Sequence, residues 1–169
     1  MIHPHIKSTS RREQFFPQAI NHYGFNRGVE IGVHWGDFSS VLLESNLSLL
    51  ISIDIWEREK ALLKAVKQLK KFGKRNCIIK TASQYAVNLF ADDFFDFIYI
   101  DSNHDYGNVK NDLSNWWPKL RTGGMFSGHN YENIENYGVI KAVDEFAAIY
   151  DIKVLTCEPK EMSWYFLKP

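Results

Sequence analysis

The chain alternates short, almost continuous apolar runs with segments whose apolar residues recur at helical spacing. The strongest run is Phe94–Asp101 (FFDFIYID), and Leu49–Asp54 (LLISID) is nearly as continuous. Runs of this kind are typical of strands that are buried on both faces. Between them, the period of an amphipathic helix is followed by Leu62, Ala65, Val66, Leu69 and Phe72. The pattern therefore predicts alternating strands and helices.

The same pattern of apolar residues predicts strands and helices along the whole chain. Strands are expected at Gly28–Val33, Leu49–Asp54, Asn76–Lys80, Phe94–Asp101, Met125–Gly128, Ile152–Cys157 and Ser163–Leu167. Helices are expected to include Gln14–Tyr23, Ser39–Ser45, Leu62–Phe72, Gln84–Phe90, Asn108–Leu120 and Val139–Tyr150. Helix and strand boundaries are expected at three places. Asp37 and Ser39 are candidate helix caps, Gly73 is expected to end a helix, and Thr122-Gly123-Gly124 is expected to form a turn.

This order of elements predicts an α/β fold. Strands separated by helices need crossover connections, which are right-handed in nearly all proteins and give a parallel sheet with helices on both faces. The last two strands are joined by a short Glu-Pro-Lys-Glu turn and are expected to pair antiparallel. The predicted fold is a three-layer, Rossmann-like sandwich with a seven-stranded, mostly parallel sheet and an antiparallel C-terminal strand.

Composition narrows the class of protein. The 169 residues predict a single domain, 1–169, whose residues 1–24 form a short N-terminal helical segment. Lys+Arg and Asp+Glu both number 20, which argues against a nucleic-acid partner because such modules carry a positive surface. No apolar run approaches the ~18 residues of a membrane span, and no signal peptide is visible. With Cys77 and Cys157 expected as reduced core thiols, the sequence predicts a cytoplasmic globular domain with no membrane partner.

Candidate ligand-binding residues follow the first two strands, and ligands of parallel sheets bind at the carboxyl ends of strands. After the first strand, Glu30, Gly32 and Gly36 form the pattern E-x-G-x-x-x-G, whose glycines permit a tight turn and close approach of a ligand. Turn chemistry alone explains this pattern equally well. Asp54 ends the second strand about 20 residues after Gly32, a spacing suited to an acceptor for ribose hydroxyls. The alternative is that Asp54 caps the helix beginning near Trp56.

Candidate catalytic residues follow the fourth and fifth strands. Asp101 ends the fourth strand, and His104 lies in the loop after it. Histidine exchanges protons near neutral pH, which makes His104 a candidate general base. His129 and Asn130 follow the fifth strand. Together with Asp101 they are three candidate metal ligands, or they form a plain hydrogen-bonded loop network.

These motifs together resemble class I S-adenosylmethionine-dependent methyltransferases. The resemblance rests on Glu30–Gly36, Asp54, Phe94–Asp101 with His104 and Tyr106, Leu120–Met125, and Gly128–Tyr131. It is closest to the small branch similar to macrocin and catechol O-methyltransferases, in which a D-x-x-H-x-Y or related loop follows the fourth strand. It covers roughly residues 25–169.

The resemblance implies a set of cofactor contacts. Glu30, Gly32 and Gly36 would hold the methionine part of S-adenosylmethionine, and Asp54 would hold the ribose hydroxyls. The segment Thr81–Gln84 is similar to the G-x-S-Q segment at the adenine edge, although Thr81 replaces the glycine. The implied cofactor-binding residues are Glu30, Gly32, His34, Trp35, Gly36, Asp54, Ile55, Ser83, Gln84 and Asp101.

The resemblance also implies catalytic roles. Asp101 would lie beside the reactive methyl group and, in metal-dependent relatives, ligate Mg²⁺. His104 falls where the branch carries its general base, and His129 replaces the relatives' second metal carboxylate, whereas Asn130 matches. Because Mg²⁺ prefers oxygen ligands, an implied metal set of Asp101, His129 and Asn130 suits a softer ion or none. The expected catalytic set is His104, Asp101 and His129, with either histidine as the base.

The expected function is methyl transfer from S-adenosylmethionine to an oxygen of a small-molecule acceptor. One alternative is a non-catalytic S-adenosylmethionine-binding protein that acts through partners, which the histidine at position 129 and the short N-terminal segment favour. The other is a Rossmann-like oxidoreductase, which the missing G-x-G-x-x-G disfavours. The sequence leaves a homo-oligomer and the identity of the acceptor open.

Overall fold

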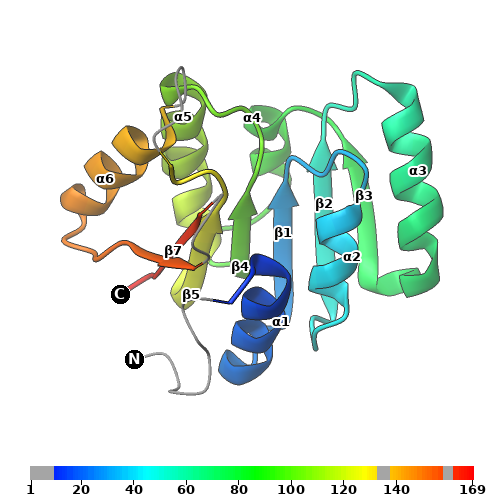
Figure 1. Cartoon of the computed structure of the whole chain (residues 1–169), viewed down its shortest axis with the longest axis horizontal. Coiled ribbons are helices and arrows are strands. Elements are labelled where there is room, and N and C mark those ends of the chain that lie inside the picture. The colour runs from blue at the N-terminus through cyan, green and yellow to red at the C-terminus, as the bar shows by residue number, and fades with distance from the viewer. Residues whose placement is uncertain (1–9, 133–137, 158–161) are drawn as a thin grey trace.

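The computed structural model describes residues 10–132, 138–157 and 162–169, in which strands and helices alternate (Figure 1). The strands are β1 (Arg27–Ile31), β2 (Leu49–Asp54), β3 (Asn76–Lys80), β4 (Phe95–Ile100), β5 (Leu120–Gly128), β6 (Leu155–Cys157) and β7 (Ser163–Leu167). The α-helices are α1 (Arg12–Tyr23), α2 (Asp37–Leu43), α3 (Glu59–Leu69), α4 (Ser83–Ala86), α5 (Tyr106–Trp116) and α6 (Val139–Ile149). Short 3₁₀ helices η1 (Lys70–Arg75), η2 (Val87–Leu89) and η3 (Trp117–Lys119) follow α3, α4 and α5.

The strands form one sheet in the order β3-β2-β1-β4-β5-β7-β6. β1 to β5 run parallel, whereas β7 pairs antiparallel with both β5 and β6. The predicted seven-stranded, mostly parallel sheet with an antiparallel C-terminal strand is therefore confirmed; the expected turn at 158–161 lies outside the described residues. The strand order reverses between β1 and β4, and in such sheets ligands bind beyond the carboxyl ends of the strands at this point.

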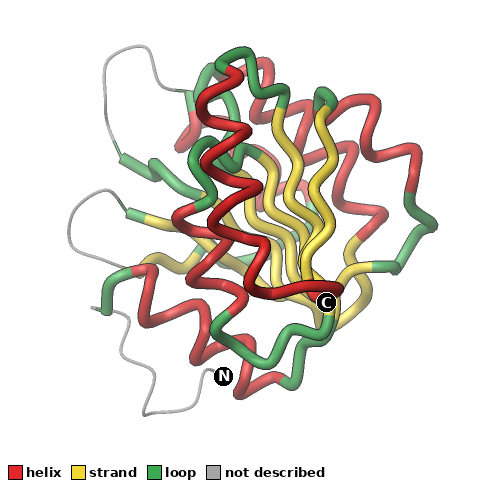
Figure 2. The backbone as a smooth tube through the Cα atoms, turned by 90° about the vertical axis from the view of Figure 1, so that its right-hand side faces the viewer, coloured by secondary structure: helices red, strands yellow, loops and turns green. Residues whose placement is uncertain are grey.

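Two helix layers enclose the sheet (Figure 2). α1 and α2 bury their apolar side chains in one cluster, and α5 and α6 bury theirs in the cluster on the opposite face. β4 shows why the apolar run predicts a central strand: Phe97 and Tyr99 pack toward α1 and α2, whereas Ile98 and Ile100 pack toward α5 and α6. Among the helices of the described ranges, none is long and apolar enough to cross a membrane.

Several expected boundaries were wrong, and glycine geometry explains three of them. β1 ends at Ile31 rather than Val33, because Gly32 turns the chain with φ of 91°. Gly36, not Asp37 or Ser39, occupies the N-cap of α2, and no side chain caps this helix. The expected turn at residues 122–124 lies inside β5, where Gly123 has φ of 74° and the register with β4 shifts.

The expectation of two core thiols was correct for one cysteine. Cys157 is buried, but Cys77 is exposed because β3 is the outer strand of the sheet. Within the part of the chain that the structure describes, neither cysteine forms a disulfide bond.

Candidate functional site

Two adjoining clefts lie at the carboxyl ends of β1 and β4. The larger has a volume of about 780 Å³ and the smaller about 330 Å³. Gly32, His34 and Asp101 line both clefts, so the clefts meet at these residues. This is the position that the reversal of strand order predicts for a ligand.

The β1–α2 loop contributes Gly32 and His34 to both clefts, and its path depends on Gly32. A Cβ atom at this position would lie 2.0 Å from the backbone oxygen of Asp101, so only glycine lets the loop cross the end of β4. Gly36 does not line either cleft. A Cβ atom there would lie 3.2 Å from Ala65, which shows that Gly36 serves the packing of α2 against α3.

Asp54 fixes the shape of that loop from the end of β2. Its Oδ2 accepts hydrogen bonds from the backbone N–H groups of Val33 and His34, both at 2.8 Å, and its Oδ1 accepts one from Trp56 at 2.7 Å. α3 begins only at Glu59, so Asp54 is not the cap of this helix. Asp54 lines the larger cleft, and a carboxylate has about four acceptor positions, which leaves capacity for a ligand hydroxyl.

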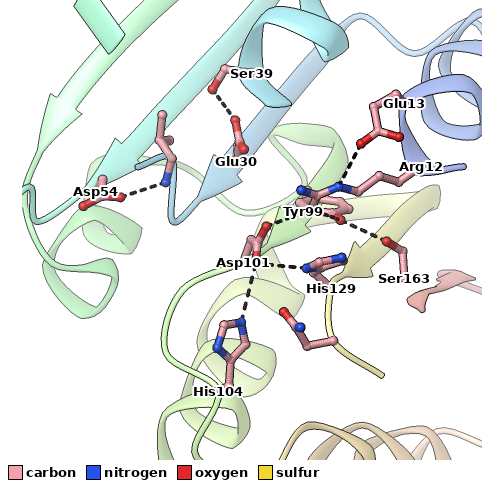
Figure 3. A network of polar contacts seen from close by, with 12 residues as sticks. Arg12, Glu13, Glu30, Ser39, Asp54, Tyr99, Asp101, His104, His129 and Ser163 are labelled. Carbon is pink, nitrogen blue, oxygen red and sulfur yellow. Dashed lines mark hydrogen bonds and ion pairs between the residues drawn. The ribbon is translucent and has the colours of Figure 1, made fainter. Parts of the chain in front are cut away.

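Glu30 is a buried acid beside the smaller cleft. Its side chain accepts a hydrogen bond from Ser39 Oγ (Figure 3). Ser39 Oγ also lies 3.1 Å from Ser52 Oγ. Burial raises the pKa of Glu30 to about 8; the Ser39 hydrogen bond opposes this, and the charge of Asp101 adds to it. Glu30 is therefore mainly protonated at neutral pH.

Asp101 is the centre of the polar cluster in Figure 3. Its Oδ2 accepts a hydrogen bond from Arg12 Nη1 at 3.0 Å, and its Oδ1 lies 3.5 Å from His104 Nε2 and 3.6 Å from His129 Nδ1. Burial by itself raises the pKa of the Asp101 carboxyl, but the contacts with His104, His129 and Arg12 outweigh it and hold that pKa well below its ordinary value. Asp101 is therefore a charged carboxylate.

Arg12 is the site residue that the sequence reasoning missed. It begins α1, and its Nη1 also donates to Tyr99 Oη at 3.2 Å, while the guanidinium lies 4.5 Å from the centre of the Phe38 ring. The available signal was its helical spacing: Arg12 is three and four positions before Phe15 and Phe16, both fully buried, and so lies on the core-facing side of the helix.

The implied adenine-edge residues differ in their surroundings. Ile55 is 51% exposed and lines the larger cleft together with Gln84. Ser83 also lines this cleft, but its Oγ donates to Asp112 and accepts a hydrogen bond from Trp116 Nε1 at 2.7 Å. Ser83 thus links α4 to α5 through two side-chain hydrogen bonds.

His34 and Trp35 take different positions in the loop. His34 is exposed, has φ of 51° and lines both clefts, whereas Trp35 lines only the smaller one. Both residues therefore lie beside the clefts.

The implied metal ligands do not fit a hard divalent cation. Asp101 and His129 lie together, but the Asn130 amide lies 3.4 Å from Glu132 Oε1. Across residues 10–132, 138–157 and 162–169, no three His, Cys, Asp or Glu side chains form a metal-binding group. The oxygens of Asp101 face a guanidinium and two imidazoles, whereas Mg²⁺ prefers oxygen ligands.

Comparisons with known proteins agree with this architecture. A family model described as a methyltransferase domain matches residues 29–131. An O-methyltransferase from Bacillus cereus in complex with S-adenosylhomocysteine (SAH) is 16% identical, with a TM-score of 0.72 over 98% of this chain and 84% of that chain. A putative caffeoyl-CoA O-methyltransferase from Staphylococcus aureus is 16% identical, with a TM-score of 0.74 over 97% and 86%.

A third solved structure is the O-methyltransferase TomG from Streptomyces achromogenes, involved in tomaymycin synthesis, in complex with S-adenosylmethionine. It is 14% identical, with a TM-score of 0.72 over 98% of this chain and 83% of that chain. No curated protein sequence matches the chain. At these identities, the likeness to solved structures establishes the fold.

Proposed function

The chain belongs to the methyltransferase-domain family, and on this premise we propose that it transfers a methyl group from S-adenosylmethionine to an oxygen of a small-molecule acceptor. The observation that carries the proposal is the pair of clefts that meet at Gly32 and Asp101. They can take the two ends of one extended ligand, with its reactive centre where they join. Bound S-adenosylmethionine and SAH in proteins of the same fold support this cofactor.

The cofactor's adenosine part fits the larger cleft, whose volume is in the usual range for small-molecule sites. Ile55 and Gln84 would contact the adenine, and Asp54 would accept hydrogen bonds from the ribose hydroxyls. The methionine part then lies in the smaller cleft beside Glu30 and Trp35. Because Gly32 has no Cβ atom, the β1–α2 loop can lie against the end of β4, and this places the loop backbone where the two clefts meet and the sulfonium would lie.

In the proposed reaction, the acceptor oxygen attacks the methyl carbon as the carbon–sulfur bond breaks and sulfur leaves as a neutral thioether. The sulfonium supplies the driving force, so the protein mainly holds oxygen, carbon and sulfur in line. A histidine takes the acceptor's proton. His104 is favoured over His129 because it lines the larger cleft and its side chain is more exposed, 27% against 11%. The charged Asp101 faces both rings and would stabilise the imidazolium that forms.

Calorimetry tests the cofactor. SAH is expected to bind with a dissociation constant in the micromolar range, about −8 kcal/mol, and to raise the melting temperature. NAD serves as the control and is expected to do neither. Binding of NAD without SAH would contradict the proposal and favour an oxidoreductase.

A panel of hydroxyl-bearing acceptors with radiolabelled S-adenosylmethionine then tests catalysis. Labelled product is expected from at least one acceptor. Tight SAH binding with no transfer across the panel would instead support the non-catalytic cofactor-binding protein.

A further inference from the structure

The carboxylate at the end of β4 already has a cation, which the chain itself supplies. Arg12 reaches Asp101 Oδ2 from α1, a helix remote in sequence, while His104 and His129 face the other oxygen (Figure 3). Both carboxylate oxygens therefore point toward nitrogen groups of the protein. A metal ion bound to Asp101 would have to displace one of them.

Arg12 is held firmly in this position. Its guanidinium contacts Tyr99 Oη and the Phe38 ring, and its side chain is only 21% exposed. Phe15 and Phe16, on the same side of α1, are fully buried, so the helix that carries Arg12 is anchored in the core. An arginine remains protonated in proteins, and the site therefore carries a permanent positive charge.

The rest of the cluster does not suit a second cation. The side chains beside Asp101 are two imidazoles, and Mg²⁺ prefers oxygen ligands. A divalent ion at Asp101 would also stand next to the guanidinium, and like charges at such short range repel each other.

We infer that Arg12 takes the place of a divalent metal at this site. It is a positioning residue: it holds Asp101 so that Oδ1 faces His104 and His129, and methyl transfer then requires no metal ion. The inference rests on the proposed function for its catalytic consequence, but the absence of a metal site can be tested without an acceptor.

The first experiment titrates the protein with Mn²⁺, with and without SAH, by calorimetry and by the electron paramagnetic resonance signal of free Mn²⁺. Neither wild type nor Asp101→Asn is expected to show saturable binding below about 1 mM. Saturable binding in wild type that Asp101→Asn abolishes would overturn the inference. If SAH itself fails to bind, the proposed function fails. The Mn²⁺ titration still decides whether Asp101, paired with Arg12, binds a divalent ion.

The second experiment compares Arg12→Met with Arg11→Met, a matched control at the neighbouring exposed arginine. Turnover at saturating S-adenosylmethionine is expected to be unchanged by EDTA in wild type and by the Arg11 substitution. Arg12→Met is expected to lower it about 100-fold, because Asp101 loses its fixed orientation. Melting temperatures verify that both variants fold.

Chemical rescue separates the positive charge of Arg12 from a merely structural role. Guanidinium ion is expected to restore part of the turnover of Arg12→Ala, whereas urea, its neutral analogue, is expected not to. Rescue by urea that equals rescue by guanidinium, or turnover of folded Arg12→Met within about twofold of wild type, would overturn the inference.

Discussion

At the scale of single residues, one carboxylate can serve both the loop and the ligand. Asp54 accepts three backbone hydrogen bonds and still lines the larger cleft. The sequence presented a ribose acceptor and a local cap as alternatives. The geometry excludes a cap of α3, and it shows how the carboxylate shapes the loop against which the cofactor would lie.

The substitution Asp54→Asn tests the proposed contact with the ribose hydroxyls. The amide keeps the size of the side chain but loses the charge, and hydrogen bonds to a charged group contribute about 1.5–3 kcal/mol each. We expect SAH affinity to fall at least tenfold, measured by calorimetry. Glu44→Gln, a surface substitution, is the control. Unchanged affinity in folded Asp54→Asn would leave Asp54 as a loop-stabilising residue only.

The two histidines can be separated by parallel substitutions. We expect His104→Ala to lower turnover by roughly 10²–10⁴-fold while SAH affinity stays within about twofold, because the ring takes a proton but does not hold the cofactor. His129→Ala is expected to have the smaller effect, since His129 does not line the larger cleft. The opposite order in single-turnover rates would assign the base to His129.

At the scale of elements, the apolar pattern was sufficient where burial decides the structure. β2, β3 and β7 have the predicted bounds, because their apolar runs end at polar or turn-forming residues. The pattern was insufficient where a backbone turn decides it, as at Gly36 and Gly123. Arg12 was missed because its partner is 89 residues away, and the contact depends on how α1 packs against β4.

Gly32 lies where the β1–α2 loop meets the end of β4, and its substitution tests this close approach. Gly32→Ala would place Cβ 2.0 Å from the Asp101 backbone oxygen, so β1 or β4 must shift. Gly24→Ala is the matched control, because Gly24 also has positive φ but has no atom within 4 Å of its added Cβ. We expect the control to cost about 1–2 kcal/mol of unfolding free energy, from backbone strain alone. Gly32→Ala should cost clearly more and abolish SAH binding; equal urea midpoints would contradict this.

At the scale of the whole molecule, buried acids make stability depend on pH in opposite directions. Burial tends to raise the pKa of Asp96, but hydrogen bonds from Arg121 and from the backbone of Arg27 and Asn26 lower it below its ordinary value of 3.8. The stability that Asp96 contributes is therefore present above pH 3.8 and is lost as the pH falls below it. Glu30 acts in the other direction, because burial raises its pKa to about 8.

Glu30 therefore predicts that the ligand-free protein loses stability as the pH rises. Between 4.5, its ordinary pKa, and about 8, the folded state keeps a proton that the unfolded state releases. The stability that Glu30 contributes is fully present below pH 4.5 and is lost as the pH rises through about 8. The free energy of unfolding then falls by at most about 1.4 kcal/mol per pH unit. Glu30→Gln keeps a neutral side chain at every pH, so its unfolding free energy should fall less than that of wild type between about pH 5 and about pH 9. Urea unfolding of both proteins at these pH values measures the difference, and parallel pH dependences would show that Glu30 is already ionised in the folded core.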